Sequence, residues 1–92
     1  MGLDTVELVM AAERQFQIEV SNAEADRWRT VGDMHAGVMA LLEERFAAEG
    51  RALRVDPDIT WALLRDLVVE ELGVKPEQVQ PDAEFVRDLG AE

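Results

Sequence analysis

Apolar residues recur every three to four positions in three stretches of the chain, the spacing of one face of an α-helix. This pattern predicts helices over 4–15, 30–50 and 57–73. The third helix is expected to begin at Pro57, because proline suits the first turn of a helix, and to end at Gly73, because glycine commonly follows the last turn. The apolar positions that recur at this spacing are Leu3, Val6, Val9, Met10 and Phe16; Val31, Met34, Val38, Leu41, Leu42 and Phe46; and Ile59, Trp61, Leu63, Leu64, Leu67, Val68 and Leu72.

Capping signals mark the starts of these helices. Asp4 with a glutamate three residues later predicts an N-cap and capping box for the first helix, and Thr30 is a plausible cap for the longest one. Ser21 and Glu24 make the same pairing at the start of a short helix, "SNAEADRWR". Two glycines lie inside the longest helix, Gly32 and Gly37, and we expect them to permit close packing against a neighbour.

The stretch 74–92 predicts a long ordered loop with one short helical turn. Its apolar anchors are Val74, Val79, Phe85, Val86 and Leu89. No stretch alternates at period two for long enough to predict a strand. The fold class expected is therefore all-α, a bundle of three long helices and one short helix.

Composition narrows the functional classes. Ninety-two residues predict a single small domain, and the absence of cysteine excludes disulfides, thiolate metal sites and a cysteine nucleophile. A net charge of −11 argues against nucleic-acid binding and favours partners with basic surfaces, or acts only as a solubilising charge. Short apolar runs and the lack of a signal-peptide pattern predict no membrane segment and a cytoplasmic location.

Motifs for catalysis or metal binding are missing from the sequence. His35 is the single histidine and has no ligands at suitable spacing, so we expect no metal. The stretch "DPD" at 56–58 begins like a calcium loop, but Trp61 stands where glycine is needed and Leu67 where glutamate is needed. There is no phosphate-binding glycine loop and no Ser-His-Asp set, and we therefore predict that the chain is not an enzyme.

Two segments carry a family resemblance. The stretch "GLDTVELVMAAERQF", followed by "SNAEADRWRTVGDM", resembles the second half of an acyl carrier protein. Residues 1–50 of this chain correspond to that half. The stretch "EELGVKPEQVQPDAEFVRDLGAE" resembles the first half of the same family and lies in residues 59–92. A linker, 51–58, separates them. The resemblance implies a single acyl-carrier-like four-helix bundle over 1–92.

The two halves stand in reversed order relative to the family. Joining "FVRDLGAE" to "MGLDTVELVM" restores a continuous carrier sequence. The linker could span more than ~20 Å when extended, at ~3.3 Å per residue. Either a circularly permuted monomer or a segment-swapped homodimer satisfies this order, and Leu53 and Val55 in the linker favour the dimer slightly because they could continue the long helix.

The family carries 4′-phosphopantetheine on the serine of its D-S-L motif. Gly2 stands at the position of that serine, flanked across the join by Glu92 and Leu3. Glycine has no hydroxyl, so no cofactor is expected on this chain. Three accounts stay open: a relative that kept only its partner-binding surface, a piece of a larger polypeptide, or a non-covalent carrier of acyl chains.

The resemblance also implies a docking surface on the first helix, which binds acyl-processing enzymes of fatty-acid or polyketide-type metabolism through their basic patches. Arg14 departs from the family, where this position is usually acidic. One alternative is that the acids form only a solvated helix face and that the apolar residues belong to the core. Another is that the chain is an interaction or regulatory protein that uses the fold without an acyl chain. The residues carried over to partner binding are Asp4, Val6, Glu7, Met10 and Glu13.

Overall fold

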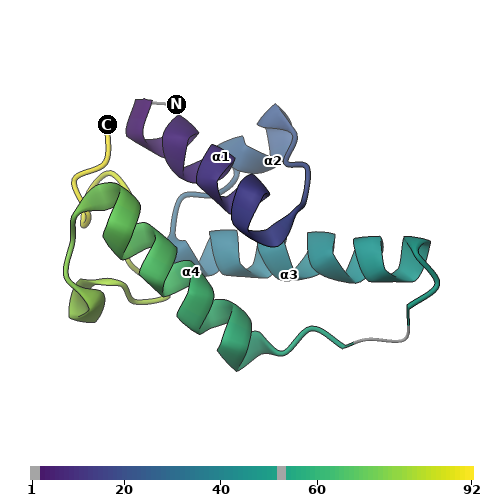
Figure 1. Ribbon diagram of the computed structural model, residues 1–92. Helices are drawn as coiled ribbons and strands as arrows, with labels where there is room; N and C mark the ends of the chain where they lie inside the picture. The colour runs from purple at the N-terminus through teal and green to yellow at the C-terminus, as the bar shows by residue number, and fades with distance from the viewer. Residues whose placement is uncertain (1–2, 52–53) are drawn as a thin grey trace.

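A computed structural model describes residues 3–51 and 54–92 of the chain. Within these ranges the regular structure is helical, and one isolated antiparallel bridge joins Thr30 to Glu84. The predicted all-α class is confirmed, and the arrangement is compatible with a helical bundle (Figure 1). The elements are α1 (Leu3–Phe16), α2 (Asn22–Asp26), α3 (Val31–Ala48), α4 (Pro57–Leu72) and a 3₁₀ turn, η1 (Pro76–Gln78).

Local capping explains where three of the helices begin. The Ser21 hydroxyl accepts a hydrogen bond from the backbone N–H of Glu24, as predicted for α2, but the predicted capping box is incomplete because the Glu24 carboxylate accepts from Arg27 and Trp28 instead. At α3, Thr30 and Asp33 form a full reciprocal capping box. Helix α4 begins one residue after Asp56, whose carboxylate accepts from two backbone N–H groups, a cap that the sequence reading missed.

The end of α3 corrects one expectation about the linker. Helix α3 stops at Ala48, and Gly50 has a φ of 70°. Residue 51 and residues 54–56 are not helical. The long helix therefore does not continue through the linker, which removes the reason for favouring a swapped dimer. Leu53 lies outside the described residues.

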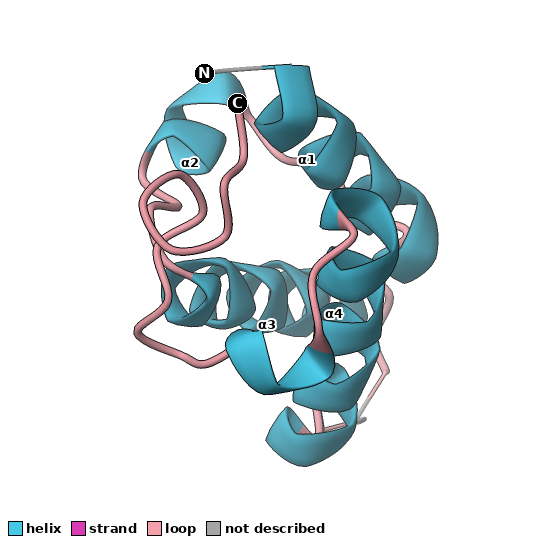
Figure 2. Ribbon diagram, turned by 90° about the vertical axis from the view of Figure 1, so that its left-hand side faces the viewer, coloured by secondary structure: helices cyan, strands magenta, loops and turns pink. Residues whose placement is uncertain are grey.

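The core is formed by residues of α1, α3 and α4, by Ile18 and Trp28 on either side of α2, and by residues from the C-terminal segment 79–92. Helix α4 packs against both α1 and α3. Figure 2 shows the C-terminal segment lying between α1 and α2 and ending beside the first turn of α1. The large side chains that are fully buried are Leu8, Met34, Leu64, Val31, Val38, Val68 and Val79.

Several residues of the predicted apolar stripes do not lie in this core. Leu3, Ile59 and Leu63 are exposed, as is Val86, a predicted anchor of the C-terminal loop, whereas Leu8 is buried although the predicted stripe omitted it. On α1 the buried face runs through Leu8, Ala11, Ala12 and Phe16, because small alanines let the helix approach its neighbours closely. A helix with apolar residues over more than half its circumference can bury only the part that meets another element.

Both internal glycines of α3 permit the close contacts expected of them. A Cβ on Gly32 would stand 2.7 Å from the carbonyl oxygen of Pro81. A Cβ on Gly37 would stand 2.4 Å from Nε1 of Trp28. These two contacts allow the C-terminal segment and the Trp28 indole to lie directly on the α3 backbone.

Among the described residues, no helix is both long enough and apolar enough to cross a membrane.

Candidate functional site

The two ends of the described chain meet at the first turn of α1. The carbonyl oxygen of Glu92 accepts hydrogen bonds from the backbone N–H groups of Asp4 (2.8 Å) and Thr5 (3.4 Å). In return, the backbone N–H of Glu92 donates to Oδ2 of Asp4 at 3.1 Å. An N-cap residue makes these same bonds to the residues three and four positions further along a helix. Glu92 therefore acts as the N-cap of α1.

This contact corrects the predicted start of the first helix. Asp4 lies inside α1, and its carboxylate serves Glu92, so Asp4 is not the N-cap and does not head a capping box with Glu7. Local sequence could not reveal this because the capping group comes from the opposite end of the chain. Gly2, the position matched to the carrier serine, lies outside the described residues.

The C-terminal segment is held firmly enough to carry this cap. The backbone N–H of Phe85 donates to the carbonyl of Arg29 at 3.1 Å, and that of Ala91 donates to the carbonyl of Phe85 at 2.9 Å. The side chains of Phe85, Leu89 and Ala91 are buried in the core. Hydrogen bonds and burial together fix Glu92 against α1.

The three acids predicted to bind partners differ in what they contact. Asp4 accepts from Glu92, and Oε2 of Glu13 accepts from the backbone N–H of Val20 at 2.9 Å. Glu7 is exposed, and within residues 3–51 and 54–92 no group forms a hydrogen bond or an ion pair with its carboxylate. Of the three acids, Glu7 is thus the one whose carboxylate is exposed to solvent without a contact to another described residue.

Apolar residues accompany Glu7 on the outer face of α1. Val6 is 39% exposed and Met10 is 49% exposed, so neither is a core residue. Leu3 is 70% exposed on the same helix, and Val86 is 68% exposed on the C-terminal segment. We define the exposed set Leu3, Val6, Glu7 and Met10 as the α1 face.

A pocket of about 360 Å³ lies beside the α1 face, between α1, α2 and the C-terminal segment. We call it the junction pocket. Its deepest lining comes from buried side chains, among them Leu8, Met34 and Trp28. The full lining is Thr5, Leu8, Val9, Ala25, Asp26, Trp28, Arg29, Met34, Glu84, Phe85 and Val86.

Among the residues that line the junction pocket, acidic groups outnumber basic ones by two to one. Asp26 and Glu84 line it together with one cation, Arg29, whose Nε lies 3.7 Å from Oε1 of Glu84. Glu84 also pairs with Arg87 at 2.8 Å. Beyond the pocket, a side-chain hydrogen bond from Arg87 lowers the pKa of Asp88, which remains a carboxylate at neutral pH.

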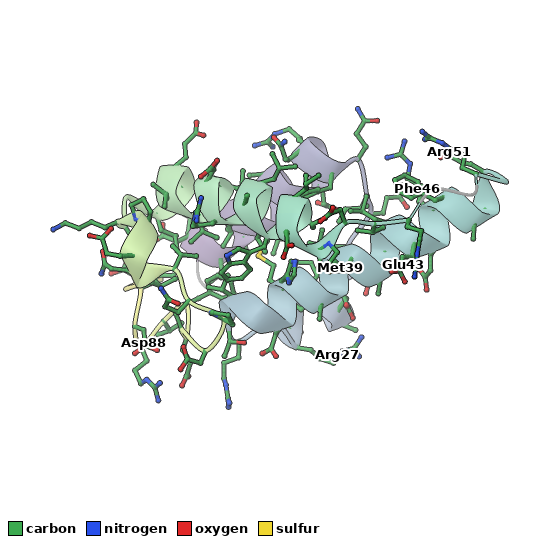
Figure 3. The ribbon with its side chains drawn as sticks, turned by 90° about the horizontal axis from the view of Figure 1, so that it is seen from below. Arg27, Met39, Glu43, Phe46, Arg51 and Asp88 are labelled. Atoms are coloured by element: carbon green, nitrogen blue, oxygen red, sulfur yellow. The ribbon has the colours of Figure 1, made fainter. Side chains whose placement is uncertain are left out.

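Arg14 lies beside Glu7 and Met10 on α1, whereas Arg45 and Arg51 lie at the far end of α3. The guanidinium carbon of Arg51 stands 5.1 Å from the centre of the Phe46 ring. This pair lies at the C-terminal end of α3, at the opposite end of the molecule from Asp88 (Figure 3). Arg45 in the same region donates to the carbonyls of Phe16 and Gln17 and so closes the end of α1.

The residues singled out for possible chemistry have structural contacts. Ser21 caps α2. Nε2 of His35 lies 3.1 Å from the carbonyl oxygen of Pro57, and its ring meets Trp61 edge-on at 5.3 Å. In the described ranges no three His, Cys, Asp or Glu side chains gather in a way that could hold a metal ion.

Sequence reasoning brought out the α1 residues and Glu92 but missed the pocket. Trp28, Arg29 and Ala25 were read only as parts of a short helix. The tryptophan beside a helix cap was the available signal, because a large aromatic residue needs a receiving surface such as the one at Gly37.

No model of a known protein family matches the chain, and the comparison with solved structures also gives no match.

Proposed function

We propose that the chain is an acyl-carrier-like docking module that binds acyl-processing enzymes without a covalent phosphopantetheine arm. The observation that carries this proposal is the contact of Glu92 with Asp4. It brings "RDLGAE" next to "LDTVELVM", the order in which the carrier family has these motifs. The motifs and the α1 face support the same proposal independently.

The chemistry follows from the residue at the attachment position. A phosphodiester to phosphopantetheine requires a hydroxyl, and Gly2 has none. What the chain retains is an acidic, partly apolar helix face on a molecule with a net charge of −11. Such a face favours fast, salt-sensitive association with a basic surface. Docking is therefore the proposed activity.

A second candidate is an interaction or regulatory protein that uses this fold and never meets an acyl enzyme. The specific observation in its favour is that Asp4 and Glu13 are engaged within the chain, which leaves Glu7 as the one fully outward acid of the predicted set. Arg14 reduces the acidity of the same helix further.

Restoring the serine tests the carrier relationship directly. We expect Gly2→Ser to gain one phosphopantetheine when incubated with coenzyme A and a broad-specificity phosphopantetheinyl transferase, as read by intact mass. The unaltered chain and the matched Gly2→Ala variant should keep their mass. If Gly2→Ser also stays unmodified while its circular dichroism is unchanged, the acyl-carrier assignment is wrong.

Reversing the charge of Glu7 tests docking. Glu7→Lys should weaken binding to the transferase or to a carrier-dependent ketosynthase by about 10-fold, or ~1.4 kcal/mol, because a rim charge of the wrong sign is placed against a basic patch. Glu70→Lys makes the same charge change at an exposed position of α4 and serves as control. If Glu7→Lys and Glu70→Lys change the affinity for these enzymes by the same factor, the second candidate is favoured.

We also propose that one chain closes its own bundle as a circular permutation. The support is that Glu92 caps α1 within a single chain and that α3 ends at Ala48. Light scattering after gel filtration should give the mass of a monomer, 10.3 kDa. A species of twice that mass would favour segment exchange instead.

A further inference from the structure

We infer that the junction pocket receives an apolar side chain of a partner protein, an aromatic or leucine anchor flanked by basic residues. This inference rests on the proposed docking function and adds the kind of partner segment that the site takes. Filling the pocket and reversing the charge of Glu7 change different parts of the surface, so the two can be tested apart.

The size and lining of the pocket suit a single large side chain. Its volume of about 360 Å³ is near the lower end of the ~300–1,000 Å³ usual for ligand sites. Leu8 and Met34 at its base are almost completely buried, and Trp28 and Phe85 present aromatic surface. Interfaces commonly draw most of their affinity from one aromatic anchor in a pocket of this kind.

The surface around the opening is ready to exclude water from such an anchor. Val86, on the pocket wall, is mostly exposed. On α1, Val9 lines the pocket, and Val6 lies three residues earlier on an adjoining, exposed part of the helix. An inserted side chain would therefore have further apolar contacts on two sides. Such surrounding contacts keep water away from a residue that contributes most of the binding energy.

Charge decides what should flank the anchor. Asp26 and Glu84 line the pocket, Arg29 and Arg87 both pair with Glu84, and Glu7 on the neighbouring face has no ion pair within the described residues. The whole chain carries −11. Lysine or arginine beside the anchor is attracted by this field, whereas a free alkyl carboxylate is repelled. A basic protein segment is therefore the occupant to which the observations point.

Two synthetic peptides provide the probe. One is a lysine- and alanine-rich helix of about 18 residues, long enough to be helical in water, with a single central phenylalanine. The other replaces that phenylalanine with alanine and is otherwise identical. Titration calorimetry gives both affinities, and ¹H–¹⁵N spectra give the residues that respond. We expect the phenylalanine peptide to bind about 10-fold or more tightly and to shift the Trp28 indole signal.

Variants that fill the pocket provide the second arm. Val9→Phe and Ala25→Leu both add volume to the lining, from a half-buried and a buried position, so that at least one should fold. Each should reduce the preference for phenylalanine to less than about 3-fold. Leu63→Phe adds an aromatic ring to an exposed position on α4 and should leave the preference unchanged.

The possible results separate the two levels of the proposal. If both peptides bind equally and Glu7→Lys weakens both, docking stands and the pocket inference is wrong. If neither peptide responds to Glu7→Lys or to added salt, the proposed docking function itself fails. If decanol saturates the pocket and shifts the Trp28 signal while the peptides do not, the occupant is a free alkyl chain and the side-chain assignment is overturned.

Discussion

Replacing Gly37 by alanine tests the closest packing contact in the core. Gly37 is buried in α3, and the Trp28 indole lies against its backbone. An added Cβ would stand 2.4 Å from Nε1 and 2.8 Å from Cε2 and Cζ2 of that ring. Ordinary van der Waals contact begins near 3.4 Å, so the indole must move by about 1 Å.

Two opposing effects set the magnitude. Alanine is the better helix former, which by itself would stabilise α3 by up to ~1 kcal/mol. Forcing an extra carbon into a packed core costs ~1–3 kcal/mol. The cost should prevail, because Trp28 is buried among other core residues and its Nε1 donates to Glu24 at 3.3 Å. We expect a net loss of ~1–2 kcal/mol, a fall in Tm of roughly 5–15 °C for a domain of this size.

Thermal and urea unfolding followed by circular dichroism measures this loss. In a Trp28→Phe background, where Nε1 and Cζ2 are gone, Gly37→Ala should cost less than ~0.5 kcal/mol, and the difference is the coupling energy of the pair. Ala36→Gly, at an exposed site of the same helix, calibrates the helix-propensity effect. An increase in Tm on Gly37→Ala in the unaltered background would refute the packing argument.

Three further predictions concern the junction and the acid limit of stability. Gly32→Ala should destabilise the chain by ~1–3 kcal/mol in urea unfolding, because the Cβ would meet the Pro81 backbone at 2.7 Å and backbone yields less readily than a side chain. Asp4→Ala should cost ~0.5–2 kcal/mol by removing the acceptor for the Glu92 N–H, while Asp4→Asn, which keeps an oxygen acceptor, should cost less; equal losses would mean that the hydrogen bond contributes nothing. Hydrogen bonds from backbone N–H groups at the start of α3 lower the pKa of Asp33 from its ordinary value of 3.8, so its stabilisation is present above that value and is lost as pH falls through the lowered pKa. Asp33→Asn should therefore flatten the Tm profile below about pH 4, and an unchanged acid limb would contradict this assignment.

Much of the helical framework could be predicted because its signals are local. Thr30 and Gly73 bound their helices as expected, and the short turn after α4 is present as η1. It was harder to predict which apolar residues of each helix face the core. Leu3 and Leu63 fit a helical period but are exposed, since that period is equally consistent with a stripe on a neighbouring side of the helix.

The parts of the site that were missed depend on contacts between distant residues. The family resemblance brings Glu92 next to the start of the first helix, but no local signal showed that Glu92 caps α1 across 88 positions of sequence. The junction pocket likewise needs Ala25, Trp28 and Phe85 to meet, and the Trp28 indole reaches its place because Gly37 leaves space for it. Periodicity describes one element at a time and cannot supply the arrangement of four.

The contacts of the α1 acids show which of them contribute to the stability of the fold and which contribute only to the surface charge. The sequence did not distinguish these two roles. Asp4 holds the C-terminal residue and Glu13 holds the Val20 backbone, so a substitution at either position changes stability as well as surface charge. Glu7 carries the same charge with no such contact within the described chain. A change in partner affinity on Glu7→Lys can therefore be read as an interface effect, whereas the same result at Asp4 would first need a correction for a loosened α1. For this reason the Glu7 charge reversal, compared with Glu70→Lys, carries the test of the proposed function.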